Sequence, residues 1–143
     1  MKPQRKQAKR YLMQISSLTK EIQRRQNEIE ALYNPVKGVS FDTIPGNGDT
    51  DATLHLIQRI ERLREKQDKR IAELIERRAE IFETVSAIRH PRAKEAIYLR
   101  YCTMLPVQQI ATRLYYSEDW VNHLLMIGLE EVADIKQFKT KIM

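Results

Sequence analysis

Residues 109–129, QIATRLYYSEDWVNHLLMIGL, decide the fold of the C-terminal part of the chain. Apolar residues repeat at helical spacing on both sides of a short polar interruption. They are Ile110 and Leu114 before it, and Val121, Leu124 and Leu125 after it. Two short helices that cross need a small residue between them, and Ala111 supplies one. The stretch therefore predicts a helix-turn-helix, in which one helix packs crosswise on the next.

The second helix of this pair has a marked start at Ser117. A serine hydroxyl just before a helix accepts a hydrogen bond from an unpaired N–H of the first turn. Glu118 and Asp119 follow, and negative charge at this end complements the helix dipole. We therefore expect the second helix to begin directly after Ser117.

These residues carry a resemblance to a known family. Residues 110–114 (IATRL), Ser117 and Val121 resemble the promoter-reading helix-turn-helix in region 4 of bacterial sigma factors, and residues 96–101 (AIYLRY) are similar to the helix before it. Over most of its length the chain resembles small phage proteins related to late-gene transcription regulators of the ArpU and RinA kind. The resemblance implies a long helical hairpin, a sigma-like end and a role in transcription.

Two amphipathic segments precede this module, and each carries one narrow apolar stripe at helical spacing. The first stripe consists of Leu12, Ile15, Leu18, Ile22, Ile29 and Leu32. The second consists of Leu56, Ile57, Ile60, Leu63, Ile71, Leu74, Ile81, Val85 and Ile88, with the polar residues Arg64, Gln67 and Arg78 between them. A narrow stripe cannot hold a lone helix in water, so we expect the two helices to pack together as a rod or as half of a larger bundle.

Two breaks divide the chain. Residues 34–50 hold two prolines and three of the four glycines, so neither long helix is expected to continue through them. Pro91 disfavours helical geometry at His90 and suits the first turn of a new helix. The sequence thus predicts an all-α fold. A long antiparallel, coiled-coil-like hairpin over residues 1–89, with a loop at 34–50, precedes a sigma-region-4-like helix-turn-helix module and C-terminal helix over residues 90–143.

Composition favours helices and permits a polyanionic partner. The chain has 143 residues, of which 31% are charged and only four are glycine, a mixture typical of long surface-rich helices. Its net charge of +6 lets lysines and arginines replace counterions on phosphates. No apolar run is long enough to span a membrane and no secretory signal is recognisable, so we expect a cytoplasmic protein in a bacterial host cell.

The chemistry-bearing residues do not form a catalytic or metal-binding pattern. Cys102 is the only cysteine, which excludes an internal disulfide, and its apolar helical setting indicates a packed thiol. His55, His90 and His123 lie in separate segments without metal-ligand spacing. Neither a nucleophile with its base nor a phosphate-binding loop is found. We therefore expect no enzyme activity, no catalytic residues, no metal and no cofactor.

If the second helix enters a major groove, its exposed N-terminal side reaches base edges. The candidate DNA-binding residues are Arg113, Ser117, Glu118, Asp119, Trp120, Asn122 and His123. The candidate phosphate contacts are Arg92, Lys94, Arg100, Lys6, Lys9 and Arg10. Sigma factors usually carry arginines on this face, whereas residues 117–135 hold five acids and neither lysine nor arginine. Positive charge for DNA binding must therefore come from outside the second helix.

Three functions remain open at this stage. The first is a phage-type transcription regulator that binds duplex DNA and uses the rod to form a homo-oligomer. The second is an adaptor whose sigma-like module binds RNA polymerase or another protein, with Trp120 or Tyr116 as an anchor. The third is a structural or assembly protein in which the helical hairpin is the active part.

Overall fold

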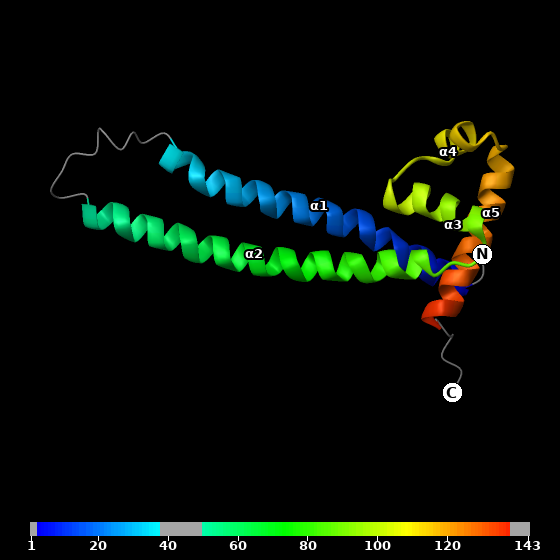
Figure 1. The fold of residues 1–143 in the computed structure, drawn as a ribbon, viewed down its shortest axis with the longest axis horizontal. Coiled ribbons are helices and arrows are strands. Elements are labelled where there is room, and N and C mark those ends of the chain that lie inside the picture. Colours follow the sequence, from blue (N-terminus) through cyan, green and yellow to red (C-terminus); the bar gives the residue numbers. More distant parts are fainter. Residues whose placement is uncertain (1–2, 38–49, 138–143) are drawn as a thin grey trace. The chain divides into compact units, whose positions relative to one another are not determined.

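All regular structure in the described part of the chain is helical, as expected. The computed structural model describes residues 3–37 and 50–137 (Figure 1). Its elements are the helices α1 (Pro3–Lys37), α2 (Thr50–Ser86), α3 (Pro91–Ile97), α4 (Val107–Leu114) and α5 (Glu118–Lys136), with a π-helical stretch η2 (Tyr98–Cys102) between α3 and α4. The predicted all-α fold class is therefore confirmed for the described residues.

The chain forms two compact units. The terminal unit consists of Met1–Thr19 with Arg77–Met143, and the two-helix unit consists of Lys20–Glu76. This division differs from the predicted boundary at residues 89 and 90, because the start of α1 and the end of α2 belong with α3, α4 and α5. The Tyr11 hydroxyl lies 3.0 Å from Thr84 Oγ1, and Lys136 of α5 lies 5.1 Å from the centroid of the Tyr11 ring.

The predicted apolar stripes supply the buried residues of both units. In the terminal unit, Leu12, Ile15 and Leu18 of α1 are buried, as are Ile81, Val85 and Ile88 of α2. In the two-helix unit, the buried residues of the described part are Ile22, Ile60, Ile71 and Leu74. The stripe thus holds the helices together in each unit, but Leu56 and Leu63 of α2 are exposed and Leu32 of α1 is only half-buried.

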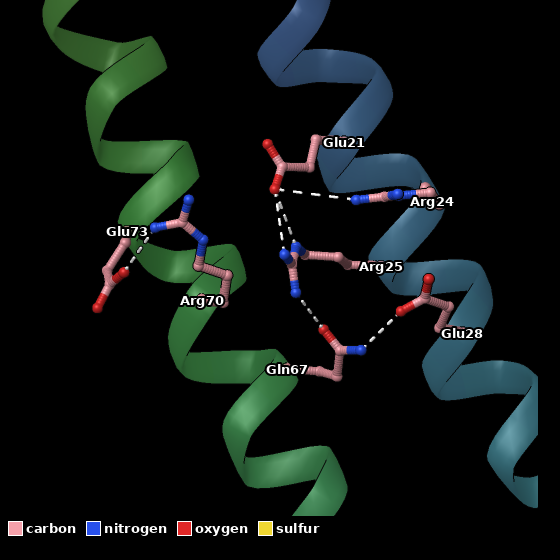
Figure 2. A network of polar contacts seen from close by, with 7 residues as sticks. All are labelled: Glu21, Arg24, Arg25, Glu28, Gln67, Arg70 and Glu73. Carbon is pink, nitrogen blue, oxygen red and sulfur yellow. Dashed lines mark hydrogen bonds and ion pairs between the residues drawn. The ribbon is translucent and has the colours of Figure 1, made fainter.

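The three polar residues predicted to interrupt the second stripe each bond to α1. In the terminal unit, Arg78 Nη1 donates to Thr19 Oγ1 at 3.1 Å. In the two-helix unit, Arg64 Nη1 donates to the Tyr33 hydroxyl at 3.0 Å, and Gln67 bonds to two side chains of α1 (Figure 2). Polar groups in a helix–helix seam favour one register over its neighbours.

The predicted break at residue 34 is wrong by about one helical turn. Helix α1 continues through Pro35 and ends at Lys37. A proline removes only its own backbone N–H, so a helix that ends two residues later loses little of its hydrogen bonding. Helix α2 begins at Thr50, ahead of the apolar pattern. Residues 38–49, which belong to the predicted loop at 34–50, lie outside the described residues.

The predicted helix start at Pro91 is confirmed. Pro91 is the first residue of α3, and His90 before it is extended, with φ −71° and ψ 111°. The His90 Nδ1 atom accepts a hydrogen bond from Ala93 N at 3.1 Å. The helix that begins at Pro91 changes to π-helical hydrogen bonding at Tyr98. Pro106 precedes α4 in an extended conformation, at the N-cap position of that helix.

Helices α3 and α5 approach closely at Gly128. A Cβ atom built on this glycine would lie 2.3 Å from Ile97 Cγ1 and 3.4 Å from the Ala93 carbonyl oxygen. Ile97 is fully buried, so it has little room to move away. Only glycine therefore fits at this point of α5 without displacing α3.

We expect Gly128→Ala to destabilise the protein by up to about 2 kcal/mol, because overpacking at Ile97, which costs about 1–3 kcal/mol, outweighs the ~1 kcal/mol that alanine gains in helix propensity. Urea unfolding followed by circular dichroism measures the change. Ile97→Ala opens space for the added methyl group, so the double variant should lose less than the sum of the two single losses. A Gly128→Ala variant as stable as the parent contradicts this view of the crossing.

Candidate functional site

Helices α4 and α5 bury apolar residues of the predicted helical pattern. Ile110 and Ala111 of α4 are buried, as are Val121, Leu124 and Leu125 of α5. Leu114, the last residue of α4, is half-buried. The Ser117 hydroxyl oxygen accepts a hydrogen bond from Trp120 N at 3.1 Å, which confirms that α5 begins after Ser117. The turn therefore has a defined geometry, and it fixes which side of α5 faces solvent.

The solvent side of the first turns of α5 carries the candidate base-reading residues. Glu118, Asp119, Asn122 and His123 are exposed, and Trp120 is 43% exposed. The Trp120 and His123 rings lie 5.2 Å apart between centroids. Arg113 is also exposed, in the last turn of α4. These side chains are accessible to a partner, whereas Ser117 is already engaged as the helix cap.

A groove of about 340 Å³ runs beside this side of α5 within the terminal unit. Its apolar lining consists of Tyr101, Val107, Leu125, Met126 and Leu129. Three cationic residues, Arg5, Lys9 and Arg100, line it together with Asn122. We call this site the basic groove. It brings α1 next to α5, although these helices are far apart in the sequence.

The cations of α1 divide into two groups by helical position. Arg5 and Lys9 are four residues apart, so they share one side of α1, and both line the basic groove. Lys6 and Arg10 are also four apart but sit about 100° further round the helix. Arg10 lines a different, shallow pocket with Gln7, Tyr11 and Gln14. Of the candidate phosphate contacts, only Lys9 and Arg100 therefore line the basic groove with Asn122.

The two cationic residues of α3, Arg92 and Lys94, lie outside the basic groove. The Arg92 Nη1 atom donates to the Tyr116 hydroxyl, and its guanidinium carbon lies 5.8 Å from the Tyr116 ring centroid. Tyr116 is thus engaged within the fold. Lys94 is half-buried in the last turn of α3. Neither Arg92 nor Lys94 lines the basic groove.

Two of the five acids on α5 have partners inside the terminal unit. Glu130 Oε1 lies 3.6 Å from Arg5 Nε. The two carboxylate oxygens of Glu131 accept hydrogen bonds from the backbone N–H groups of Arg89, at 2.8 Å, and His90, at 3.2 Å. These contacts hold α5 to α1 and to the turn before α3. The acidic character of α5 therefore arises partly from residues that maintain the fold.

Cys102 follows the predicted pattern of a packed thiol. It is half-buried in η2, and burial raises the pKa of its thiol from 9.0 to about 11. Burial also raises the pKa of the neighbouring Tyr101, with the charge of Arg100 acting in the opposite direction. Because the thiolate is the nucleophilic form, this environment lowers the reactivity of Cys102 near neutral pH.

Comparison of the chain with protein-family models, with curated proteins and with solved structures gave no match. None of the helices in residues 3–37 and 50–137 combines the length and the apolar character that crossing a membrane requires. The site is therefore interpreted from its own residues.

Sequence analysis did not assign a role to three residues that shape the terminal unit around this site. Arg5 belongs to the basic N-terminal segment, but only the fold separates it from Lys6 by placing it in the groove. Glu131 looks like any acid on a helix surface until its contacts are known. Gly128 carried a usable signal, because a lone glycine inside a helical pattern often marks a close approach.

We expect Glu131→Ala to lower the free energy of unfolding by about 1–2 kcal/mol, because two backbone N–H groups lose a charged acceptor. Chemical denaturation measures the change. Asp134→Ala is the matched control, since it removes an exposed carboxylate from the same helix. Equal losses in the two variants would show that the Glu131 contacts add nothing to stability.

We expect alkylation of Cys102 by iodoacetamide at pH 8 to be about 100-fold slower than in the denatured chain, because a pKa near 11 rather than 9.0 reduces the thiolate fraction by that factor. The rate should rise about tenfold per pH unit and level off near pH 11, provided that the fold persists. Mass spectrometry of quenched samples follows the reaction. Labelling at pH 8 as fast in the folded as in the denatured chain contradicts this environment.

Proposed function

We propose that this protein is a phage-type transcription regulator that binds duplex DNA through α4 and α5. In this proposal the pair acts as a helix-turn-helix similar to region 4 of sigma factors, as in regulators of the ArpU and RinA kind. The two-helix unit, the distal part of the predicted hairpin, serves self-association. The observation that carries the proposal is the basic groove, which gathers Arg5, Lys9 and Arg100 beside Asn122.

The exposed first turns of α5 suit a major groove. An asparagine amide can accept from and donate to the edge of adenine, and a glutamate can accept from the amino group of cytosine. Asn122 and Glu118 are exposed on this side, and His123 stands beside Asn122. We propose that Asn122 and His123 contact base edges while Lys9 and Arg100 contact the flanking phosphates.

The acids of α5 disfavour DNA binding because they repel phosphates. The contacts that two of these acids make within the fold reduce this repulsion. Glu130 faces Arg5, so these two charges offset each other, and the carboxylate of Glu131 is directed at the backbone N–H groups before α3. Glu118 and Asp119 remain exposed at the start of α5, where their negative charge interacts favourably with the helix dipole. The positive charge needed for DNA comes from α1 and η2, as the acidic sequence of α5 requires.

A second candidate is a protein-binding adaptor, with RNA polymerase or another protein as its partner. Two exposed aromatic side chains near the α4–α5 turn favour it, Tyr115 at 95% exposure and Trp120 at 43%. Large aromatic side chains dominate the binding energy of many protein interfaces. In this role the acids of α5 would not oppose the partner.

The DNA proposal is tested by fluorescence anisotropy with a duplex from the gene's own upstream region, titrated at several salt concentrations. We expect binding that weakens as salt rises and that falls by at least about tenfold in Asn122→Ala/His123→Ala, since each good base contact contributes ~1–3 kcal/mol. Lys9→Gln/Arg100→Gln should weaken binding to all duplexes and lower the slope of log K against log salt by about 2.

Lys6→Gln/Arg10→Gln is the matched control, because it removes the same amount of charge at two residues of α1 that do not line the basic groove. It should lower affinity much less than Lys9→Gln/Arg100→Gln. If the two double variants lose the same affinity, DNA is attracted by the net charge of the protein and the basic groove does not bind it specifically. If no duplex binds at low salt, direct DNA binding is wrong, and a polymerase pull-down compared between the parent and Trp120→Ala tests the adaptor.

A further inference from the structure

The two-helix unit carries apolar surface that its own two helices do not cover. Leu63 of α2 is 41% exposed, and Leu56, two turns earlier on the same side, is 49% exposed. Ile29 and Leu32 of α1 are only half-buried. Two helices with so thin a core gain little from packing on each other alone.

This apolar surface forms a groove of about 570 Å³ between α1 and α2, which we call the leucine groove. Its apolar residues are Ala31, Leu32 and Leu63, and its charged residues are Arg25, Glu28 and Lys66. Gln67 completes the lining. All of the lining residues belong to the two-helix unit.

Three of the polar side chains that line the groove, Arg25, Glu28 and Gln67, are bonded in one network, as Figure 2 shows. Arg25 Nη1 donates to Gln67 Oε1 at 2.9 Å, and Gln67 Nε2 donates to Glu28 Oε2 at 2.7 Å. Arg25 also pairs with Glu21 at 3.2 Å. A partner can therefore cover this network without leaving its groups unbonded, which lowers the desolvation cost of binding.

We propose that the leucine groove is the interface with a second copy of this chain. This inference rests on the self-association within the proposed function and names the surface that carries it. The groove is self-complementary, because it presents an acid from α1, Glu28, and a base from α2, Lys66, beside the same leucines. In a two-fold interface each copy's acid faces the other's base. Lys66 makes no ion pair within residues 3–37 and 50–137, so its charge is available for this contact.

The apolar residues of the leucine groove also fit a second copy of the chain. The helices of a second copy expose the same leucines, so each copy covers Leu63 and Leu32 of the other. Leu56 and the half-buried Ile57 extend the apolar surface along α2. An extended helical face is needed, since a stable dimer buries about 1,200–2,000 Å² in total. The resulting assembly is a four-helix arrangement built from two pairs.

Sedimentation velocity without DNA tests this interface independently of the DNA proposal. The parent protein should be a dimer, and Leu63→Glu should raise the dimer dissociation constant by about tenfold or more, since it places a charge in the apolar centre. Leu54→Glu is the matched control, because Leu54 is 51% exposed on the opposite side of α2. It should leave the dimer intact, and circular dichroism should show equal helix content in all three proteins.

Charge exchange between copies gives a second test. Glu28→Lys and Lys66→Glu each place like charges across the interface, so each variant alone should dimerise more weakly. Mixing the two variants should produce a heterodimer in which both ion pairs are restored, detectable by native mass spectrometry. Repair within a single chain cannot produce this result. A monomeric parent protein, equal disruption by Leu54→Glu and Leu63→Glu, or failure of the mixed variants to pair would each overturn the proposal.

Discussion

Helices α3 and α5 can pack in direct contact only because Gly128 places no side chain between them. Close packing at this point brings the turn before α3 within reach of Glu131, whose carboxylate then bonds to the N–H groups of Arg89 and His90. One turn of α5 thus combines a steric constraint with a polar one. The basic groove next to α5 has a lining that draws on α1, η2, α4 and α5.

The distribution of charge in the terminal unit follows from this packing. The acids of α5 would repel a polyanion if all of them faced solvent freely, but Glu130 and Glu131 are directed to partners in the fold. The cations that line the groove come from other helices. A surface helix can therefore be acidic in sequence while the site beside it is basic, so net charge per helix is a poor guide to what the site attracts.

Much of the local structure was predictable from sequence, because helix ends and stripes are set by near neighbours. Ser117 and Pro91 marked helix starts through hydrogen bonding and steric preference, and Gln67 marked a polar position in the seam. The end of α1 was missed because a proline near a helix terminus costs less than one in its middle. The grouping of Lys9 with Arg100 and Asn122 was beyond reach, since no sequence spacing connects residues about ninety or more positions apart.

Tyr115 shows how a turn can prepare a side chain for contact. Its φ of 60° is a left-handed conformation that costs a residue with a Cβ atom about 1 kcal/mol. Hydrogen bonds from the N–H groups of Tyr115 and Tyr116 to the Ala111 carbonyl hold the backbone there, while the Tyr115 ring remains almost fully exposed. A molecule that binds this ring meets a backbone that is already ordered. The turn has already lost its conformational entropy on folding. Binding therefore costs less entropy, and more of the contact energy contributes to association.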